Sequence, residues 1–298
     1  MIIRPRPSLL MLFFVLKGSI ILRTWPQLAA VGLLSGAVVT AHRYAPHLVP
    51  GVNPAPFTLI GIALSIFLSF RNSACYDRWW EARKLWGQII QTARDIARQT
   101  VVLDDAAEPP SQERRDTLAA VIAFGYAAVR QLRRQADSLA AGDPPPRASP
   151  ADAILHDAAA LIGRMLRRNR LEPVEALALN DSLGRLTQAL VGCERLANTP
   201  LPFAYTLLLH RTAYLFCFIL PFGFADTLGW ATPLAAMLVA YTFFGLDALG
   251  EELEEPFGLM PNDLPISAYA TTIEIHLRSA LGETDLPPMP APVDYVLI

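Results

Sequence analysis

The stretch "PFTLIGIALSIFLSFRNSACYDRWWEARKLWG", residues 56–87, decides the fold because it joins an uncharged half directly to a charged half. No side chain is charged up to Phe70, whereas both signs of charge and three tryptophans follow from Arg71 onward. An uncharged helical segment suits the hydrocarbon core of a bilayer, and a charged one suits water. The stretch therefore predicts one continuous helix that runs from a membrane into an aqueous part of the protein.

Within the uncharged half, large apolar residues form one row. Ile62, Ile66 and Phe70 recur every four residues, and Leu59 extends the row. Residues at this spacing share one helix face. The row fits a lipid-facing or core-packing stripe, and it also fits the hydrophobic constriction of a pore, which conducts ions only when water fills it. One helix cannot form a ring, so the pore interpretation requires a symmetric homo-oligomer.

Composition points to a membrane protein with a polar part. The chain has 298 residues, of which 53% are hydrophobic and 17% charged, and its mean hydropathy is +0.33. The net charge of −2 and the lack of a basic run argue against nucleic-acid binding. Cys75, Cys193 and Cys217 lie far apart without a CxxC motif, so we expect buried neutral thiols and no zinc site.

Four segments are apolar enough to cross a bilayer, which takes about 17–25 residues per helix. They are residues 25–41, 57–70, 203–224 and 228–246. The second segment is short alone, but the helical pattern continues after Arg71. Most basic residues lie before the first segment and between the second and third. Because basic residues favour the cytoplasmic side, we expect both termini and the long middle in the cytoplasm.

The middle of the chain is a helical domain rather than a loop. Helical periodicity runs through it, interrupted at "EPPS", "GDPPPRASP" and "NRLEP". The predicted fold is therefore an all-α membrane protein with transmembrane helices continuous with a helical cytoplasmic domain. The expected parts are an N-terminal interfacial helix (1–24), a transmembrane hairpin (25–70), the cytoplasmic domain (71–202), a second hairpin (203–250) and a cytoplasmic C-terminal segment with an extended, proline-rich tail (251–298).

The charges and tryptophans after Phe70 have ordinary structural interpretations. Asp77 and Glu81 stand at helical spacings from Arg78, Arg83 and Lys84, so they fit intrahelical ion pairs. The three tryptophans, Trp79, Trp80 and Trp86, fit an aromatic belt at the membrane surface.

Two basic residues inside the third segment also need an explanation. His210 and Arg211 fit a buried structural pair in which Arg211 meets a carboxylate such as Asp247, Glu251 or Glu252. They also fit a site along an ion path, because charges inside spans usually face protein or water.

An enzymatic function is not expected. The chain has no GxSxG, HExxH, Walker or GxGxxG motif, and its five histidines have no metal-binding spacing. We expect no catalytic residue, no cofactor and no metal. Besides a channel, a non-conducting membrane scaffold or regulatory protein remains compatible with the sequence.

Three motifs together carry a family resemblance. They are "RNSACYDRWWEARKLWG" (71–87), "GCERLANTPLPFAYTLLLHRT" (192–212) and "LGEELEEPFG" (249–258), in this order. On these motifs the sequence resembles the bestrophin family of ion channels over nearly its whole length, and its bacterial members most. The resemblance implies a structural role for the charged and aromatic residues Arg78, Trp79, Trp80, Arg211, Glu251 and Glu252.

The resemblance also implies an assembly and a function. Four transmembrane helices per subunit would assemble as a homopentamer in the inner (plasma) membrane around one pore, with the neck at Ile62, Ile66 and Phe70. A cytoplasmic vestibule would end in a second constriction, for which Leu177 and Leu179 are candidates. Small monovalent ions would pass without catalysis. Selectivity stays open, because animal members resemble anion (chloride) channels and some bacterial relatives are taken to conduct cations.

One departure from the family bears on regulation. Animal members follow "PFG" with a run of acidic residues that forms a calcium clasp, whereas here "LMPNDLP" follows, with Asp263 as its only acid. Calcium takes six to eight oxygen ligands. We therefore expect no calcium activation through such a clasp. The resemblance also implies that tail residues such as Tyr295 contact a neighbouring subunit and bias opening.

Overall fold

The computed structural model describes residues 1–4, 8, 10, 15, 18–47, 49, 51–104, 109–141 and 149–298. Across these residues, β pairing is limited to isolated bridges that involve Ile2, Val293 and Val296, so the all-helical prediction is confirmed. Much of the predicted interfacial helix (1–24) lies outside the described residues; α2 begins at Ile21.

The chain divides into two compact units. The first, which we call the apolar unit, comprises Pro5–Asp77 and Leu201–Glu254. The second, the polar unit, comprises Met1–Arg4, Arg78–Pro200 and Glu255–Ile298. Helix α3, Ala55–Gln99, is one 45-residue helix that belongs to both, so the continuous helix predicted from residues 56–87 is confirmed.

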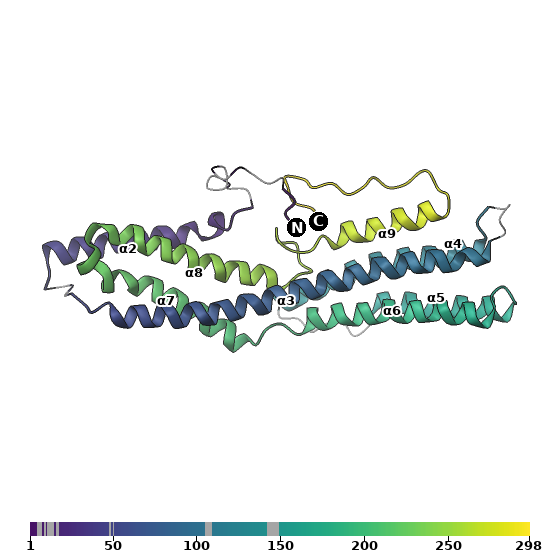
Figure 1. The fold of residues 1–298 in the computed structure, drawn as a ribbon, viewed down its shortest axis with the longest axis horizontal. Helices are drawn as coiled ribbons and strands as arrows, with labels where there is room; N and C mark the ends of the chain where they lie inside the picture. Colours follow the sequence, from purple (N-terminus) through teal and green to yellow (C-terminus); the bar gives the residue numbers. More distant parts are fainter. Residues whose placement is uncertain are drawn as a thin grey trace. The chain divides into compact units, whose positions relative to one another are not determined.

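The apolar unit is built from α2 (Ile21–Tyr44), the first part of α3, α7 (Phe203–Leu228) and α8 (Thr232–Glu254). These helices enclose a core that includes Val31, Leu64, Leu68, Ala213 and Phe244. Helices α7 and α8 lie side by side, joined by the short 3-10 turn η2, Gly229–Ala231 (Figure 1). Gly229 has a φ of 50°, in the left-handed region that favours glycine.

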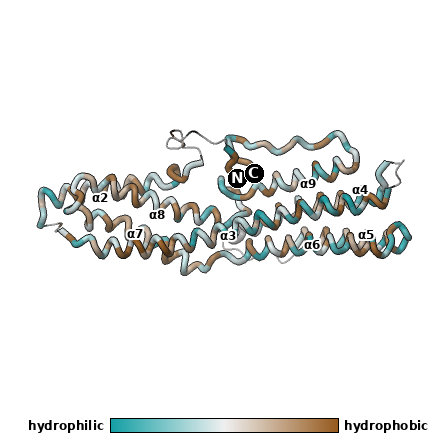
Figure 2. Tube along the Cα trace, viewed as in Figure 1, coloured by the Kyte–Doolittle hydropathy of each residue, from teal (hydrophilic) through white to brown (hydrophobic). Residues whose placement is uncertain are grey.

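Three stretches in the described residues are long and apolar enough to cross a membrane. They are Ile21–Tyr44, Ala55–Leu103 and Phe203–Glu254, and the third contains both α7 and α8. Hydrophobic positions run along α2, α7 and α8 (Figure 2). By length and composition, these helices indicate a membrane protein.

The polar unit contains the rest of α3, η1 (Thr100–Leu103), α4 (Gln112–Ala141), α5 (Pro150–Arg167), α6 (Pro173–Asn198) and α9 (Ile266–Ala280). The predicted interruptions fall between these helices. Ser149 caps α5 by accepting a hydrogen bond from the Asp152 amide, and Glu172 and Glu175 form a capping box at the start of α6. A single core joins the helices of this unit around Trp86, Phe124 and Leu186.

All three cysteines are buried, as predicted. Burial, together with the nearby carboxylates of Glu194 and Glu81, raises the pKa of the Cys193 thiol to about 12. Its thiol is therefore neutral at physiological pH.

The proline-rich tail is extended, as predicted, and its end pairs with the chain's own first residues. The amino group of Met1 donates to the Leu297 carbonyl at 2.6 Å, and the Ala268 amide of α9 donates to the Ile298 carbonyl at 3.1 Å. The Arg4 guanidinium lies over the Tyr295 ring, 4.8 Å from its centroid. Both ends of the chain are thus held on the polar unit.

The tryptophans differ in environment although they lie close in sequence. Trp86 is fully buried in the core of the polar unit, so its assignment to an aromatic belt was wrong. Trp80 keeps 44% of its surface exposed and stacks on Trp79 with ring centroids 6.3 Å apart. Only Trp86 therefore contributes a whole indole to the core.

Trp86→Ala is expected to lower the free energy of unfolding by about 3–5 kcal/mol, because it removes a fully buried indole and leaves a cavity. Trp80→Ala is the matched control and should lower the free energy of unfolding much less, because Trp80 is partly exposed. Thermal denaturation of the detergent-solubilised variants measures both. Equal losses in the two variants would contradict the assignment of Trp86 to the core.

Candidate functional site

The predicted stripe on α3 is uncovered by its own chain. Leu59, Ile62, Ile66 and Phe70 keep between 50% and 68% of their surfaces exposed. Large apolar side chains in a contiguous exposed row mark a surface that meets other molecules. The stripe therefore faces lipid, other copies of the chain, or a lumen that several copies enclose.

The opposite edge of α3 holds the helix in the apolar unit. Leu64 and Leu68 are buried in the core shared with α7 and α8. At Gly61 an added Cβ would lie 3.1 Å from Phe216 Cζ, so the glycine lets the phenyl ring approach the α3 backbone. The tyrosine hydroxyl of Tyr205 donates to the Phe67 carbonyl at 3.1 Å. One edge is packed, and much of the remaining surface is available to other molecules.

A buried ion pair follows the stripe. Arg71 is completely buried, and its Nη1 lies 2.5 Å from Asp247 Oδ1 on α8. Its Nη2 lies 3.8 Å from Glu254 Oε2. Gly250 leaves room on α8 for the side chains of Asn72 and Arg71, because an added Cβ would lie 2.8 Å from Asn72 Oδ1 and 3.4 Å from Arg71 Cζ. Arg71 thus pairs with two carboxylates of α8, Asp247 and Glu254.

Asp247 connects this pair to α7. Its Oδ2 lies 2.7 Å from His210 Nδ1, and the His210 ring packs against the Tyr214 ring at a tilt of 34°, with centroids 4.4 Å apart. Arg23 of α2 pairs with Glu251 and lies 3.8 Å from Glu252. The cluster joins all four helices of the apolar unit through ion pairs and the His210–Asp247 contact.

Three residues of the same cluster are arranged like the ligands of a metal ion. His210, Asp247 and Glu251 each offer a ligand atom, and these atoms lie within 4.8 Å of one another. Both carboxylates already have guanidinium partners, Arg71 and Arg23. A divalent cation would have to displace these partners, so the arrangement suits an ion-pair network better.

The predicted pairing of Arg211 was wrong. Arg211 is exposed, and among the described residues it has no carboxylate within ion-pair distance. Its neighbour His210 and the more distant Arg71 and Arg23 take the expected carboxylates. An arginine placed directly after a wholly uncharged helical run was the sequence signal for Arg71.

The Arg78–Trp79 pair has a structural role in the polar unit. The Arg78 guanidinium donates to the carbonyls of Leu196 and Thr199, at 2.7 and 2.6 Å. These carbonyls lie at the C-terminal end of α6, where helix carbonyls lack intrahelical partners and the dipole favours a cation. The Trp79 indole donates to the Asn262 carbonyl at 2.9 Å. The pair therefore fastens α3 to α6 and to the segment before α9.

The neighbouring charges also contact other groups rather than forming the predicted intrahelical ion pairs. Glu81 pairs with Arg195 of α6, and Arg83 lies over the Tyr269 ring, 4.9 Å from its centroid. Lys84 lies 6.0 Å from the Trp80 ring centroid. The charged half of the quoted stretch thus holds the polar unit together.

The two candidates for a second constriction differ in exposure. Leu177 keeps 69% of its surface exposed, whereas Leu179 keeps 1% and belongs to the core of the polar unit. A residue buried inside one chain cannot line a lumen. Leu179 is therefore withdrawn, and Leu177 alone stays a candidate.

Comparison with known proteins gives consistent likenesses. A family model described as "Bacterial/Fungal Bestrophin protein" matches residues 1–279. The chain is 42% identical to the voltage-dependent anion channel-forming protein mll4386 of Mesorhizobium japonicum, over 99% of this chain and 97% of that protein. It is 39% identical to the voltage-dependent anion channel-forming protein YneE of Escherichia coli K12, over 96% of each. A crystal structure of a bacterial bestrophin homologue from Klebsiella pneumoniae matches with a TM-score of 0.77 at 35% identity, covering 88% of this chain and 98% of that one.

Arg71→Met is expected to destabilise the protein by about 3–5 kcal/mol, because it leaves the Asp247 carboxylate buried without its guanidinium. The double variant Arg71→Met/Asp247→Asn removes the orphaned charge and should recover part of this loss. Arg211→Met, at an exposed arginine, is the control and should change stability within about 0.5 kcal/mol. Thermal denaturation in detergent measures all three. A loss for Arg71→Met no larger than for Arg211→Met would contradict the buried pair.

Proposed function

Because the chain belongs to the bacterial and fungal bestrophin family, which indicates an ion channel and not an enzyme, we propose that it forms a homopentamer around one central pore. In this proposal, four helices per subunit span the inner (plasma) membrane: α2, the first part of α3, α7 and α8. Both termini and the polar unit lie in the cytoplasm. The pentamer number rests on the family resemblance.

The exposed stripe on α3 carries the proposal. Ile62, Ile66 and Phe70 are apolar, uncovered and opposite the packed edge of the helix. Copies arranged about an axis would bring these side chains into a ring, and a narrow apolar ring sheds water and stops ions. The stripe thus acts as the neck of the pore, and each subunit supplies one wall of it.

Conduction in this channel is diffusion down a gradient. Ions cross when the neck is wide enough to hold water, and no bond is made or broken. Beyond the neck, the polar units of the subunits surround a vestibule, and Leu177 lines its second constriction. No cofactor takes part.

We propose anion selectivity, with chloride as a permeant ion. The support is that the relatives at 42% and 39% identity are named anion channel-forming proteins. The neck side chains are neutral, so they favour neither sign of charge. The sign of the selectivity therefore depends on charged groups outside the neck.

Selectivity is measured with purified protein in planar bilayers under asymmetric NaCl. An anion-selective channel gives a reversal potential near the equilibrium potential of chloride. A reversal potential near that of sodium would replace the anion proposal with a cation channel and would leave the neck unaffected.

Ile66→Ala is expected to raise the open probability or single-channel conductance several-fold, because the smaller side chain widens the neck and eases its wetting. Ile60→Ala is the matched control. Ile60 is similarly exposed, 42% against 50%, but it lies roughly 120° around the helix from Ile66. Single-channel recordings of both variants and wild type test the assignment.

Equal effects of the two variants would show that the stripe is not the neck. Silence of wild type and both variants, from oligomers that elute as one species, would favour the non-conducting scaffold.

A further inference from the structure

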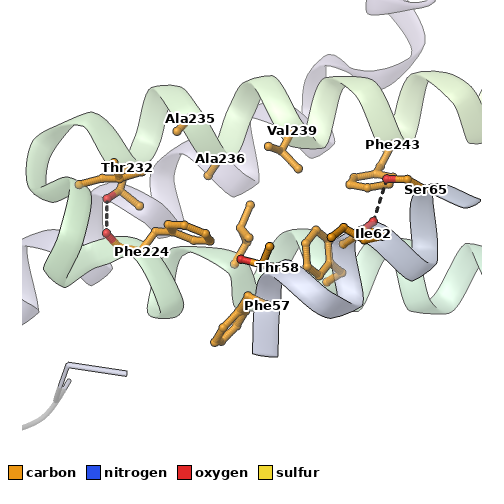
Figure 3. A pocket seen from close by; sticks show the side chains of 14 residues that line it. Phe57, Thr58, Ile62, Ser65, Phe224, Thr232, Ala235, Ala236, Val239 and Phe243 are labelled. Atoms are coloured by element: carbon orange, nitrogen blue, oxygen red, sulfur yellow. Dashed lines mark hydrogen bonds between the residues drawn. The ribbon is translucent and has the colours of Figure 1, made fainter. Parts of the chain in front are cut away.

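A cavity in the apolar unit lies between α3, α7 and α8 (Figure 3). Its volume is about 360 Å³, within the range of small-ligand sites. Its walls include Phe57 and Ile62 of α3, Phe224 of α7, and Val239 and Phe243 of α8. Because Ile62 keeps 55% of its surface exposed, the cavity opens at the surface of the unit.

Among the residues that the structure describes, the lining of this cavity offers no free donor to a polar ligand. No charged side chain is among these lining residues. Its three hydroxyl groups donate to backbone carbonyls: Thr58 to Pro54 at 3.3 Å, Ser65 to Gly61 at 2.7 Å, and Thr232 to Phe224 at 3.2 Å. A buried water needs two to four polar partners, so water is held poorly here. The chemistry of the walls selects an apolar occupant.

The cavity also borders the contacts that position α3. Phe216 lies against Gly61, and Phe57 lies against Gly223 of α7, where an added Cβ would come within 2.6 Å of the ring. Both contacts place an aromatic ring on a glycine backbone. Material that enters the cavity therefore presses on the α3 segment that carries Ile62.

We infer that this cavity binds an acyl chain of a membrane phospholipid, and that its occupancy adjusts the width of the neck through Ile62. A lipid chain is the apolar molecule present at high concentration around a membrane-embedded unit, and the described walls of the cavity are apolar. The coupling to conduction rests on the proposed channel function. The binding itself does not.

The binding is tested by photolabelling the purified, full-length protein in nanodiscs that contain a phosphatidylcholine with a diazirine on one acyl chain. Peptide mass spectrometry then locates the adducts. We expect adducts on Phe224, Val239 or Phe243, in addition to those on exposed lipid-facing residues such as Leu234. Ala235→Leu fills the cavity and should reduce the cavity adducts several-fold.

Two further variants control this test. Ala30→Leu makes the same substitution at an exposed position of α2 away from the cavity and should leave the cavity adducts unchanged. Val239→Ala enlarges the cavity and should keep or raise them, so the proposal stays testable if Ala235→Leu does not fold. Adducts on Leu234 without adducts in the cavity would overturn lipid binding. Lipid binding would also be overturned if a cysteine introduced as Ser65→Cys formed cross-links to a second copy of the chain, because that copy would then occupy the cavity.

The coupling is tested by recording the same variants in planar bilayers. We expect Ala235→Leu to change the open probability several-fold and Ala30→Leu to leave it at the wild-type value. Cavity adducts together with identical currents in both variants would overturn the coupling. Adducts in a protein that carries no current would overturn the proposed function and the coupling, and would leave lipid binding supported.

Discussion

The buried pair of Arg71 and Asp247 is the constraint on which the arrangement of the apolar unit depends. A guanidinium taken out of water costs several kcal/mol unless a well-placed anion offsets it, and Arg71 is completely buried with Asp247 at 2.5 Å. At about 100° per residue, Arg71 shares one edge of α3 with Leu64 and Leu68. Burying this edge turns Ile62, Ile66 and Phe70 to the opposite side. The pair thus sets the rotation of α3 about its own axis and leaves the stripe exposed.

Hydrophobic periodicity and proline-rich interruptions were sufficient to predict the helices, because both are local properties of the sequence. The partners of charged residues were not predictable in the same way. Arg211 was expected to meet Asp247, yet successive residues on a helix point about 100° apart, so a helix that turns His210 toward Asp247 turns Arg211 away. Which of the two faces inward depends on how α7 packs against α8. This packing is a property of the tertiary structure, and the spacing of residues along α7 does not predict it.

Two other errors were avoidable from the sequence itself. Leu179 stands in a row with Leu183, Leu186 and Leu190, an i, i+4, i+7, i+11 pattern typical of a buried helix face. Leu177 lies off this row, so the buried and exposed members of the pair were distinguishable. Trp86 likewise stands seven residues after Trp79, on the same face of α3, whereas Trp80 is rotated away from it. The shared residue type suggested one aromatic belt, but the positions of the tryptophans around the helix place Trp80 on a different face from Trp79 and Trp86.

The proposed neck restricts the ways in which such a channel is regulated. Its side chains carry no charge to titrate or neutralise, so its state changes only through its width or its wetting. Width depends on the position of α3, which the buried ion pair fixes at one end of the stripe. At the other end α3 rests on aromatic rings placed against glycines, contacts without directional bonds. The helix is therefore most easily displaced beside Ile62, next to the apolar cavity. An apolar ligand at this place acts on the width of the neck without any charged group.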